Sequence, residues 1–182
     1  IHLSDDELKQ LDIASWMHDI GKITTPEYVV DKATKLETIY DRIEYVISKF
    51  EVLKRDKEIE YLKASLDASQ KEKELLKKEY EKEIALIEDD IKFIKITNKG
   101  SEFMEDDKIH RLNQIAPTPL VIDGKKTTLL TENELYNLSI RKGTLTNEER
   151  DIINYHVNMS YKMLSKLSFP KKLERVPIIA AS

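Results

Sequence analysis

The sequence predicts an all-α fold with one small β-hairpin. Its 182 residues include only four glycines and five prolines, so few positions break regular structure. Hydrophobic residues make up 40% of the chain and charged residues 35%, and Leu, Ile, Lys and Glu are favoured. This composition is typical of long amphipathic helices in a folded protein.

The first helix is expected to begin after Ser4, because Ser4 and Glu7 form the pattern of a capping box. Apolar residues at helical spacing continue it as far as Asp19, and Gly21 is a natural end. We expect this helix to be mostly buried, with Trp16 packed in the core. A short helix that begins at a proline should follow it.

Residues 37–97 are expected to form coiled-coil-like helices. A polar stretch around Ser69 leaves two alternatives open, which are an antiparallel helical hairpin that turns there and one long interrupted helix. The capping-box pattern of Ser69 and Glu72 favours the hairpin. The apolar residues that recur at three- and four-residue steps are Leu36, Ile39, Ile43, Val46, Phe50 and Leu53, then Leu62 and Leu66, and later Leu76, Tyr80, Ile87, Ile91 and Ile94.

A short helix over 102–115 and a β-hairpin over 120–130 are expected next. Prolines end the helix, and the Asp123-Gly124 dipeptide between two apolar runs is the signal of a tight hairpin turn. These two elements complete the middle of the chain.

The last fifty residues predict further helices. Capping boxes at Thr131 and Thr146 each begin one, and the second helix should continue through His156 until Pro170 breaks it. A final buried helix is expected over 176–181.

Charge and composition exclude several classes of protein. The net charge of −4 gives no general attraction for a nucleic acid polymer or an anionic membrane. The absence of cysteine excludes disulfides and thiolate metal sites, and no apolar run approaches membrane-spanning length. We therefore expect a cytoplasmic protein without direct membrane contact. Because the sequence starts with Ile1, we expect it to be part of a longer chain.

The most informative motif is His18-Asp19-Ile20-Gly21-Lys22. An adjacent His and Asp can give an imidazole nitrogen and a carboxylate oxygen to a divalent metal, and the carboxylate can bridge two metals. His156 is a second candidate imidazole ligand. Three alternatives are a helix-terminal pair without metal, a core histidine at His156, and a Lys22 that only complements a helix dipole.

This pentapeptide, together with residues 143–150 ahead of His156, resembles the HD-GYP branch of the HD-domain metal-dependent phosphohydrolases. The resemblance covers roughly residues 3–35 and 138–182. It implies an HD-type helical bundle, in which residues far apart in the sequence meet at one site.

The resemblance also implies how the chain is divided. Residues 1–36 and 140–182 would form an incomplete HD-type core, and residues 37–139 would be an insertion within it. Long insertions are tolerated in bundle loops because the entropy of loop closure grows slowly with length.

By the same resemblance His18, Asp19 and His156 are metal ligands, with Asp19 bridging two divalent ions of iron, manganese or magnesium. Asp19 and Lys22 are the implied catalytic residues, and Lys22 contacts a phosphate of the substrate. No organic cofactor is implied. The reaction is hydrolysis of a phosphodiester, typically cyclic di-GMP, in signalling.

The chain departs from the family pattern at three places. The Gly-Tyr-Pro signature is absent, as are the His-His-Glu segment expected just after Ser182 and an upstream helix with Glu and His ligands. We therefore expect the parent protein to be the enzyme and this piece alone to be inactive. A sensory or receiver domain is expected elsewhere in the parent.

Two other hypotheses stay open. One is a catalytically degenerate HD module that acts in signal relay or forms a homodimer through its coiled coil. The other is a hydrolase of a different nucleotide phosphate. The residues immediately after Ser182 would separate catalysis from degeneracy, and a panel of substrates would identify the phosphate ester.

Overall fold

The computed structural model describes residues 3–101 and 103–182. Its elements are helices apart from one two-stranded sheet, which confirms the expected fold class. The chain divides into two compact units. The terminal unit comprises Ile1–Asp31 and Leu145–Ser182, and the middle unit comprises Lys32–Thr144.

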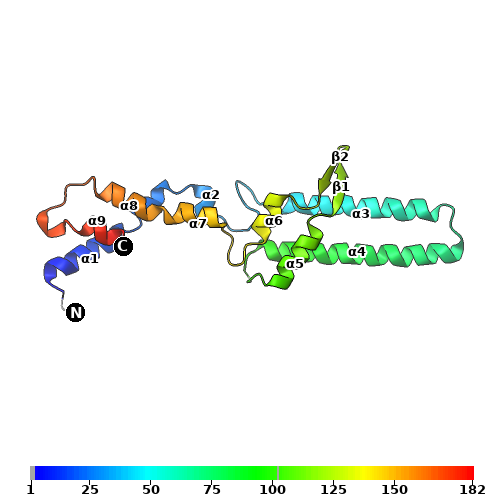
Figure 1. Cartoon of the computed structure of the whole chain (residues 1–182), viewed down its shortest axis with the longest axis horizontal. Helices are drawn as coiled ribbons and strands as arrows, with labels where there is room; N and C mark the ends of the chain where they lie inside the picture. Colours follow the sequence, from blue (N-terminus) through cyan, green and yellow to red (C-terminus); the bar gives the residue numbers. More distant parts are fainter. Residues whose placement is uncertain (1–2, 102) are drawn as a thin grey trace. The chain divides into compact units, whose positions relative to one another are not determined.

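In the terminal unit, the two ends of the chain pack together (Figure 1). The first helix contacts the last one, and the helix that begins at His156 contacts the 3-10 turn that follows the first helix. A small core of Ala14, Leu164, Val176 and Ala180 lies among them. The elements are α1 (Asp5–Met17), η1 (Ile20–Thr24), α2 (Glu27–Val30), α7 (Asn147–Asn154), α8 (His156–Leu164), η2 (Lys171–Leu173) and α9 (Val176–Ala180).

Local capping explains where α1 begins. The backbone N–H and the hydroxyl of Ser4 each donate to Glu7 Oε2 at 2.8 Å, and the Ser4 Oγ accepts from the Glu7 N–H at 3.4 Å. These reciprocal bonds satisfy main-chain donors that the first turn leaves without helical partners. The expected capping boxes at Ser69, Thr131 and Thr146 are also present.

Two expectations for the terminal unit are wrong. Helix α1 is mostly exposed, with only Gln10 and Ala14 buried, and Trp16 is 84% exposed. The reason is that α1 packs against α9 and η2, which cover one face of it. The single helix expected through His156 is instead two helices, because α7 ends at Asn154 and α8 begins at His156.

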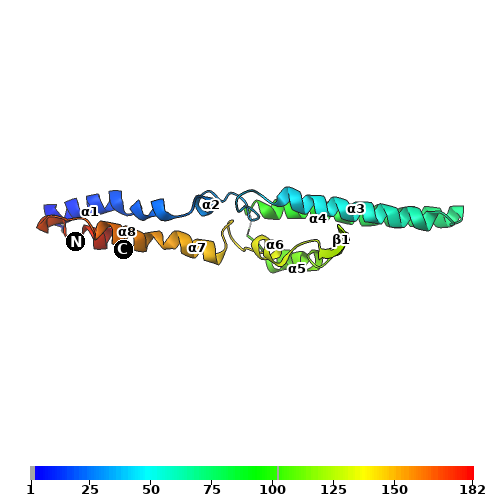
Figure 2. The same ribbon diagram turned by 90° about the horizontal axis from the view of Figure 1, so that it is seen from above.

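The middle unit is built on a helical hairpin (Figures 1 and 2). Helices α3 (Ile43–Ser65) and α4 (Gln70–Asn98) lie side by side and antiparallel, so of the two alternatives the structure has the hairpin. The Tyr61 and Tyr80 rings stack across it with centroids 4.9 Å apart. The expected helix start at residue 37 is wrong, and Ile39 is 92% exposed because it lies in the loop before α3.

The remaining elements of the middle unit cover the base of this hairpin. They are α5 (Asp106–Ile115), β1 (Pro119–Ile122), β2 (Lys125–Thr128) and α6 (Glu132–Leu138). The start expected for α5 at residue 102 lies outside the described residues. Asp123 and Gly124 both have positive φ, as a tight two-residue hairpin turn requires.

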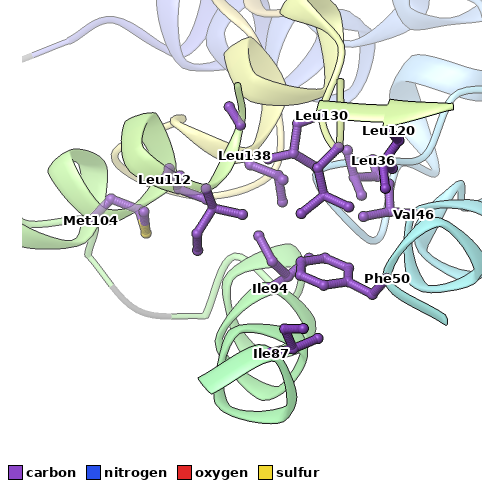
Figure 3. Packing of buried hydrophobic residues seen from close by; sticks show 13 residues of the cluster. Leu36, Val46, Phe50, Ile87, Ile94, Met104, Leu112, Leu120, Leu130 and Leu138 are labelled. Carbon is purple, nitrogen blue, oxygen red and sulfur yellow. The ribbon is translucent and has the colours of Figure 1, made fainter. Parts of the chain in front are cut away.

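A hydrophobic cluster fills the space where these elements meet (Figure 3). Phe50 from α3 and Ile94 from α4 face leucines from α5, β1 and α6. This cluster makes the base of the hairpin the packed part of the middle unit. Its buried members are Leu36, Val46, Phe50, Ile87, Ile94, Met104, Leu112, Ile115, Ala116, Leu120, Leu129, Leu130 and Leu138.

Buried charges lie beside this cluster. Lys49 Nζ and Glu134 Oε2 form an ion pair at 2.8 Å, and each side chain is 3% exposed. Lys35 is fully buried, and its Nζ donates to the carbonyl oxygens of Leu138 at 2.9 Å and Ile140 at 2.7 Å. Burial lowers the pKa of Lys35 to about 8, with a smaller effect from the nearby charge of Lys108.

Among the residues that the structure describes, no helix is both long and apolar enough to cross a membrane.

Candidate metal centre

The predicted site residues lie at the ends of three elements of the terminal unit. His18 is the C-cap of α1, Asp19 is the N-cap of η1, and His156 is the first residue of α8. Because α8 packs against η1, these residues lie close together although they are far apart in the sequence. The structure therefore places His18, Asp19, Lys22 and His156 in one cluster.

The Asp19 carboxylate lies between the two imidazoles. Its Oδ2 is 3.3 Å from His18 Nε2, and its Oδ1 is 3.4 Å from His156 Nε2. The His156 side chain is 14% exposed, whereas that of His18 is 59% exposed, so the cluster opens to solvent on the His18 side.

The other nitrogen of each ring is held by the main chain. His18 Nδ1 lies 2.7 Å from the Ser15 carbonyl oxygen, and His156 Nδ1 contacts the Ile153 carbonyl oxygen. A carbonyl oxygen only accepts, so each Nδ1 carries the hydrogen. In the neutral rings each Nε2 then presents a lone pair toward the Asp19 carboxylate. A cation held among these groups would relieve the repulsion between the two lone pairs and the carboxylate.

Lys22 occupies part of this cluster. Its Nζ donates to Asp19 Oδ2 at 2.7 Å, and the Lys22 side chain is about half exposed. This hydrogen bond, with smaller contributions from the nearby charges of His18, Lys22 and His156, lowers the pKa of the Asp19 carboxyl. Asp19 is therefore ionised at neutral pH, as a metal ligand must be.

The donor chemistry fits a divalent metal, but the ligand set is partial. Two imidazole nitrogens and one carboxylate are donors that iron and manganese accept. Within the described residues, no group of three or more His, Asp and Glu side chains is arranged to hold a metal ion. A metal at this place would need Lys22 to leave Asp19 and further ligands to complete the set.

Sequence reasoning missed one residue that the structure connects to this cluster. Ser160 is fully buried on α8, and its Oγ bonds to main-chain groups on both sides of Asp19. The only signal in the sequence is that Ser160 follows His156 by four residues, a spacing that puts both on one helix face. Small polar residues occur at that spacing too often for it to be informative.

The comparisons with known proteins bear on the second half of the chain. No curated protein and no solved structure was found to match the chain. A family model described as an HD domain matches residues 131–182, a stretch that runs from α6 to α9 and does not contain the pentapeptide that begins at His18. An HD domain is therefore found over residues 131–182, in the part of the chain that supplies His156.

Proposed function

We propose that this chain is part of a metal-dependent phosphohydrolase of the HD type, in which His18, Asp19 and His156 are metal ligands. The observation that carries this proposal is the position of the Asp19 carboxylate between two Nε2 atoms whose rings are fixed through Nδ1. The HD domain match over residues 131–182 supports it independently, since HD domains are generally metal-dependent phosphohydrolases.

Each residue has a role that follows from its contacts. The two histidines present Nε2 in a fixed orientation, because the hydrogen bond of each Nδ1 sets the tautomer and the ring plane. Asp19 offers one oxygen toward each ring, which suits a carboxylate that bridges two ions. A divalent metal held by His18, Asp19 and His156 would supply an acidified water and would neutralise phosphoryl charge.

Lys22 is the residue best suited to bind a phosphate. Its side chain is about half exposed beside Asp19, and the ammonium group can turn from the carboxylate to a substrate oxygen as a point-charge donor. The ion pair with Asp19 then serves as the resting position of this side chain.

The finer assignment rests on the sequence motifs. The pentapeptide that begins at His18 and the segment 143–150 resemble the HD-GYP branch, so we propose a phosphodiester substrate, typically cyclic di-GMP, and a role in signalling. Because the described ligand set is partial, we propose that the complete enzyme uses further ligands and that residues 1–182 alone do not turn over substrate. Iron and manganese fit the nitrogen donors better than magnesium does.

A second candidate function is a degenerate module that relays a signal without catalysis. The observation that favours it is the 2.7 Å ion pair of Lys22 with Asp19, because a lysine that neutralises the carboxylate can replace a metal. In that case the helical hairpin of the middle unit would carry the function, through a homodimer.

The two candidates are separated by a hydrolysis assay on the complete protein that contains this chain. Cyclic di-GMP is incubated with protein and Mn²⁺, and the products are resolved by chromatography. We expect linear dinucleotide or GMP from the wild type, none from Asp19→Asn, and wild-type yields from Asp12→Asn, an exposed aspartate on α1. Unchanged turnover in Asp19→Asn refutes the site. Absence of both product and bound Mn²⁺ in the wild type favours the degenerate module.

A further inference from the structure

We propose that Ser160 is a positioning residue for the His18-Asp19 pair. Its effect on metal binding rests on the function proposed above, but its effect on the geometry of the pair does not. The pair lies in the turn between α1 and η1. Ser160 would fix the position of this turn along the axis of α8, next to His156.

Two hydrogen bonds tie Ser160 to the turn that carries the pair. The Ser160 hydroxyl donates to the His18 carbonyl oxygen at 2.8 Å, and its Oγ accepts from the Gly21 N–H at 2.9 Å. These two main-chain groups lie on either side of Asp19 in the sequence. A single buried side chain thus fixes the chain directly before Asp19 and two residues after it, around the carboxylate that faces both imidazoles.

Close packing at Gly21 restricts where the turn can lie against α8. A Cβ atom on Gly21 would lie 2.0 Å from the His156 carbonyl oxygen and 2.6 Å from the Ser160 backbone nitrogen. The turn therefore lies directly on the backbone of α8, and no side chain separates them. At such a short separation, a hydroxyl that bonds both main-chain groups sets the position of the turn along the helix.

His156 connects this position to the candidate metal centre. His156 and Ser160 are four residues apart on α8, so they occupy one face of the helix, one turn apart. Sliding the turn along α8 would move Asp19 relative to His156 Nε2, which is now 3.4 Å from Asp19 Oδ1. Ser160 therefore acts on the three candidate ligands through the backbone, without touching a metal or a substrate itself.

The test compares Ser160→Ala with Ser165→Ala in the full chain. Ser165 is exposed at the end of the same helix and serves as the matched control. The first measurement is the protonated nitrogen of the His18 ring, read from two-bond ¹H–¹⁵N correlation spectra without metal. The second is the affinity for Co²⁺, measured by titration calorimetry, because Co²⁺ binds nitrogen donors more tightly than Mn²⁺ does.

In the wild type we expect the hydrogen of His18 on Nδ1, as its contact with Ser15 requires. In Ser160→Ala we expect a mixture of ring states and a Co²⁺ affinity lower by about 10-fold to 100-fold, the usual effect of losing an outer partner of a ligand. Ser165→Ala should match the wild type in both measurements.

Wild-type values for both measurements in folded Ser160→Ala overturn the proposal. If that variant does not fold, Ser160→Cys replaces it, because the thiol keeps the shape but bonds weakly, and wild-type values there overturn the proposal equally. A wild type that binds no Co²⁺, with a His18 ring state that still changes in Ser160→Ala, supports the positioning role and counts against the proposed metal function.

Discussion

The buried ion pair of Lys49 and Glu134 allows a sharp test of how the base of the middle unit is stabilised. The perturbation is Lys49→Met, which keeps most of the volume of the side chain but removes its charge. The Glu134 carboxylate would then be buried without its cation, although the Thr131 N–H at 2.8 Å and the Thr131 side chain still hydrogen-bond to it. An uncompensated buried charge is expensive, and breaking such pairs costs about 3–5 kcal/mol.

The matched variant removes both charges. In Lys49→Met/Glu134→Gln, the glutamine can still accept from the Thr131 N–H, so the capping box survives. We expect this double variant to lie within about 1–2 kcal/mol of the wild type, because replacing both members of a buried pair by neutral groups is often nearly neutral. The double variant should therefore be more stable than the single variant Lys49→Met.

The measurement is urea unfolding followed by circular dichroism at 222 nm, which reports chiefly on the long helices α3 and α4. A loss below about 1 kcal/mol in Lys49→Met would show that the pair is hydrated and that no uncompensated buried charge is left. A double variant as unstable as the single one would equally contradict the expected cost of an unpaired charge, because the loss would then come from packing around the methionine.

The same pair predicts a pH dependence with a definite sign. Burial opposes ionisation of Glu134, but the hydrogen bonds from Lys49 and Thr131 together with the charge of Lys49 outweigh it, and the pKa of Glu134 is lowered from 4.5. The folded state therefore binds the proton less readily than the unfolded state. The stabilisation is complete above pH 4.5 and is lost as the pH falls through the folded pKa. Lys49→Met should lose less stability over this range than the wild type.

Three further outcomes are expected. Because the pKa of Lys35 falls to about 8 on folding, the free energy of unfolding should rise by up to about 3 kcal/mol from pH 8 to 10.5, and urea titrations of Lys35→Met should lack this rise. Gly21→Ala should destabilise the terminal unit by about 3 kcal/mol, because its Cβ meets the backbone of α8; an unchanged melting curve would contradict the close packing. In Gly124→Ala the new Cβ would meet no other atom, so only the positive φ should destabilise the protein. We expect a loss of about 1 kcal/mol in the free energy of unfolding, measured by the same thermal unfolding experiment.

The candidate site was predicted in part. The sequence predicted four of its residues, because a compact motif and a distant histidine can be recognised in the sequence alone. The structure places these residues, His18, Asp19, Lys22 and His156, in one cluster. Ser160 could not be named, because its role comes from bonds to main-chain groups, which any sequence offers at every position. The roles of all of these residues stay predictions until the experiments above are done.

The structural features that could be predicted from the sequence alone depend on local interactions. The capping boxes at Ser4, Ser69, Thr131 and Thr146 and the turn at Asp123-Gly124 were predicted correctly, because each depends on interactions within about four residues. The all-α class followed from composition for a related reason, since helix propensity is a property of short segments.

Tertiary structure alone decided which helical faces are covered. Trp16 is exposed because α1 is covered on one face, whereas Lys35 is buried because the chain around Leu138 folds over it. Both outcomes contradict what hydrophobicity would suggest for a tryptophan and a lysine. Burial depends on segments that lie far away in the sequence, and the polar partners that make a buried lysine tolerable are main-chain carbonyls that no pattern of side chains reveals.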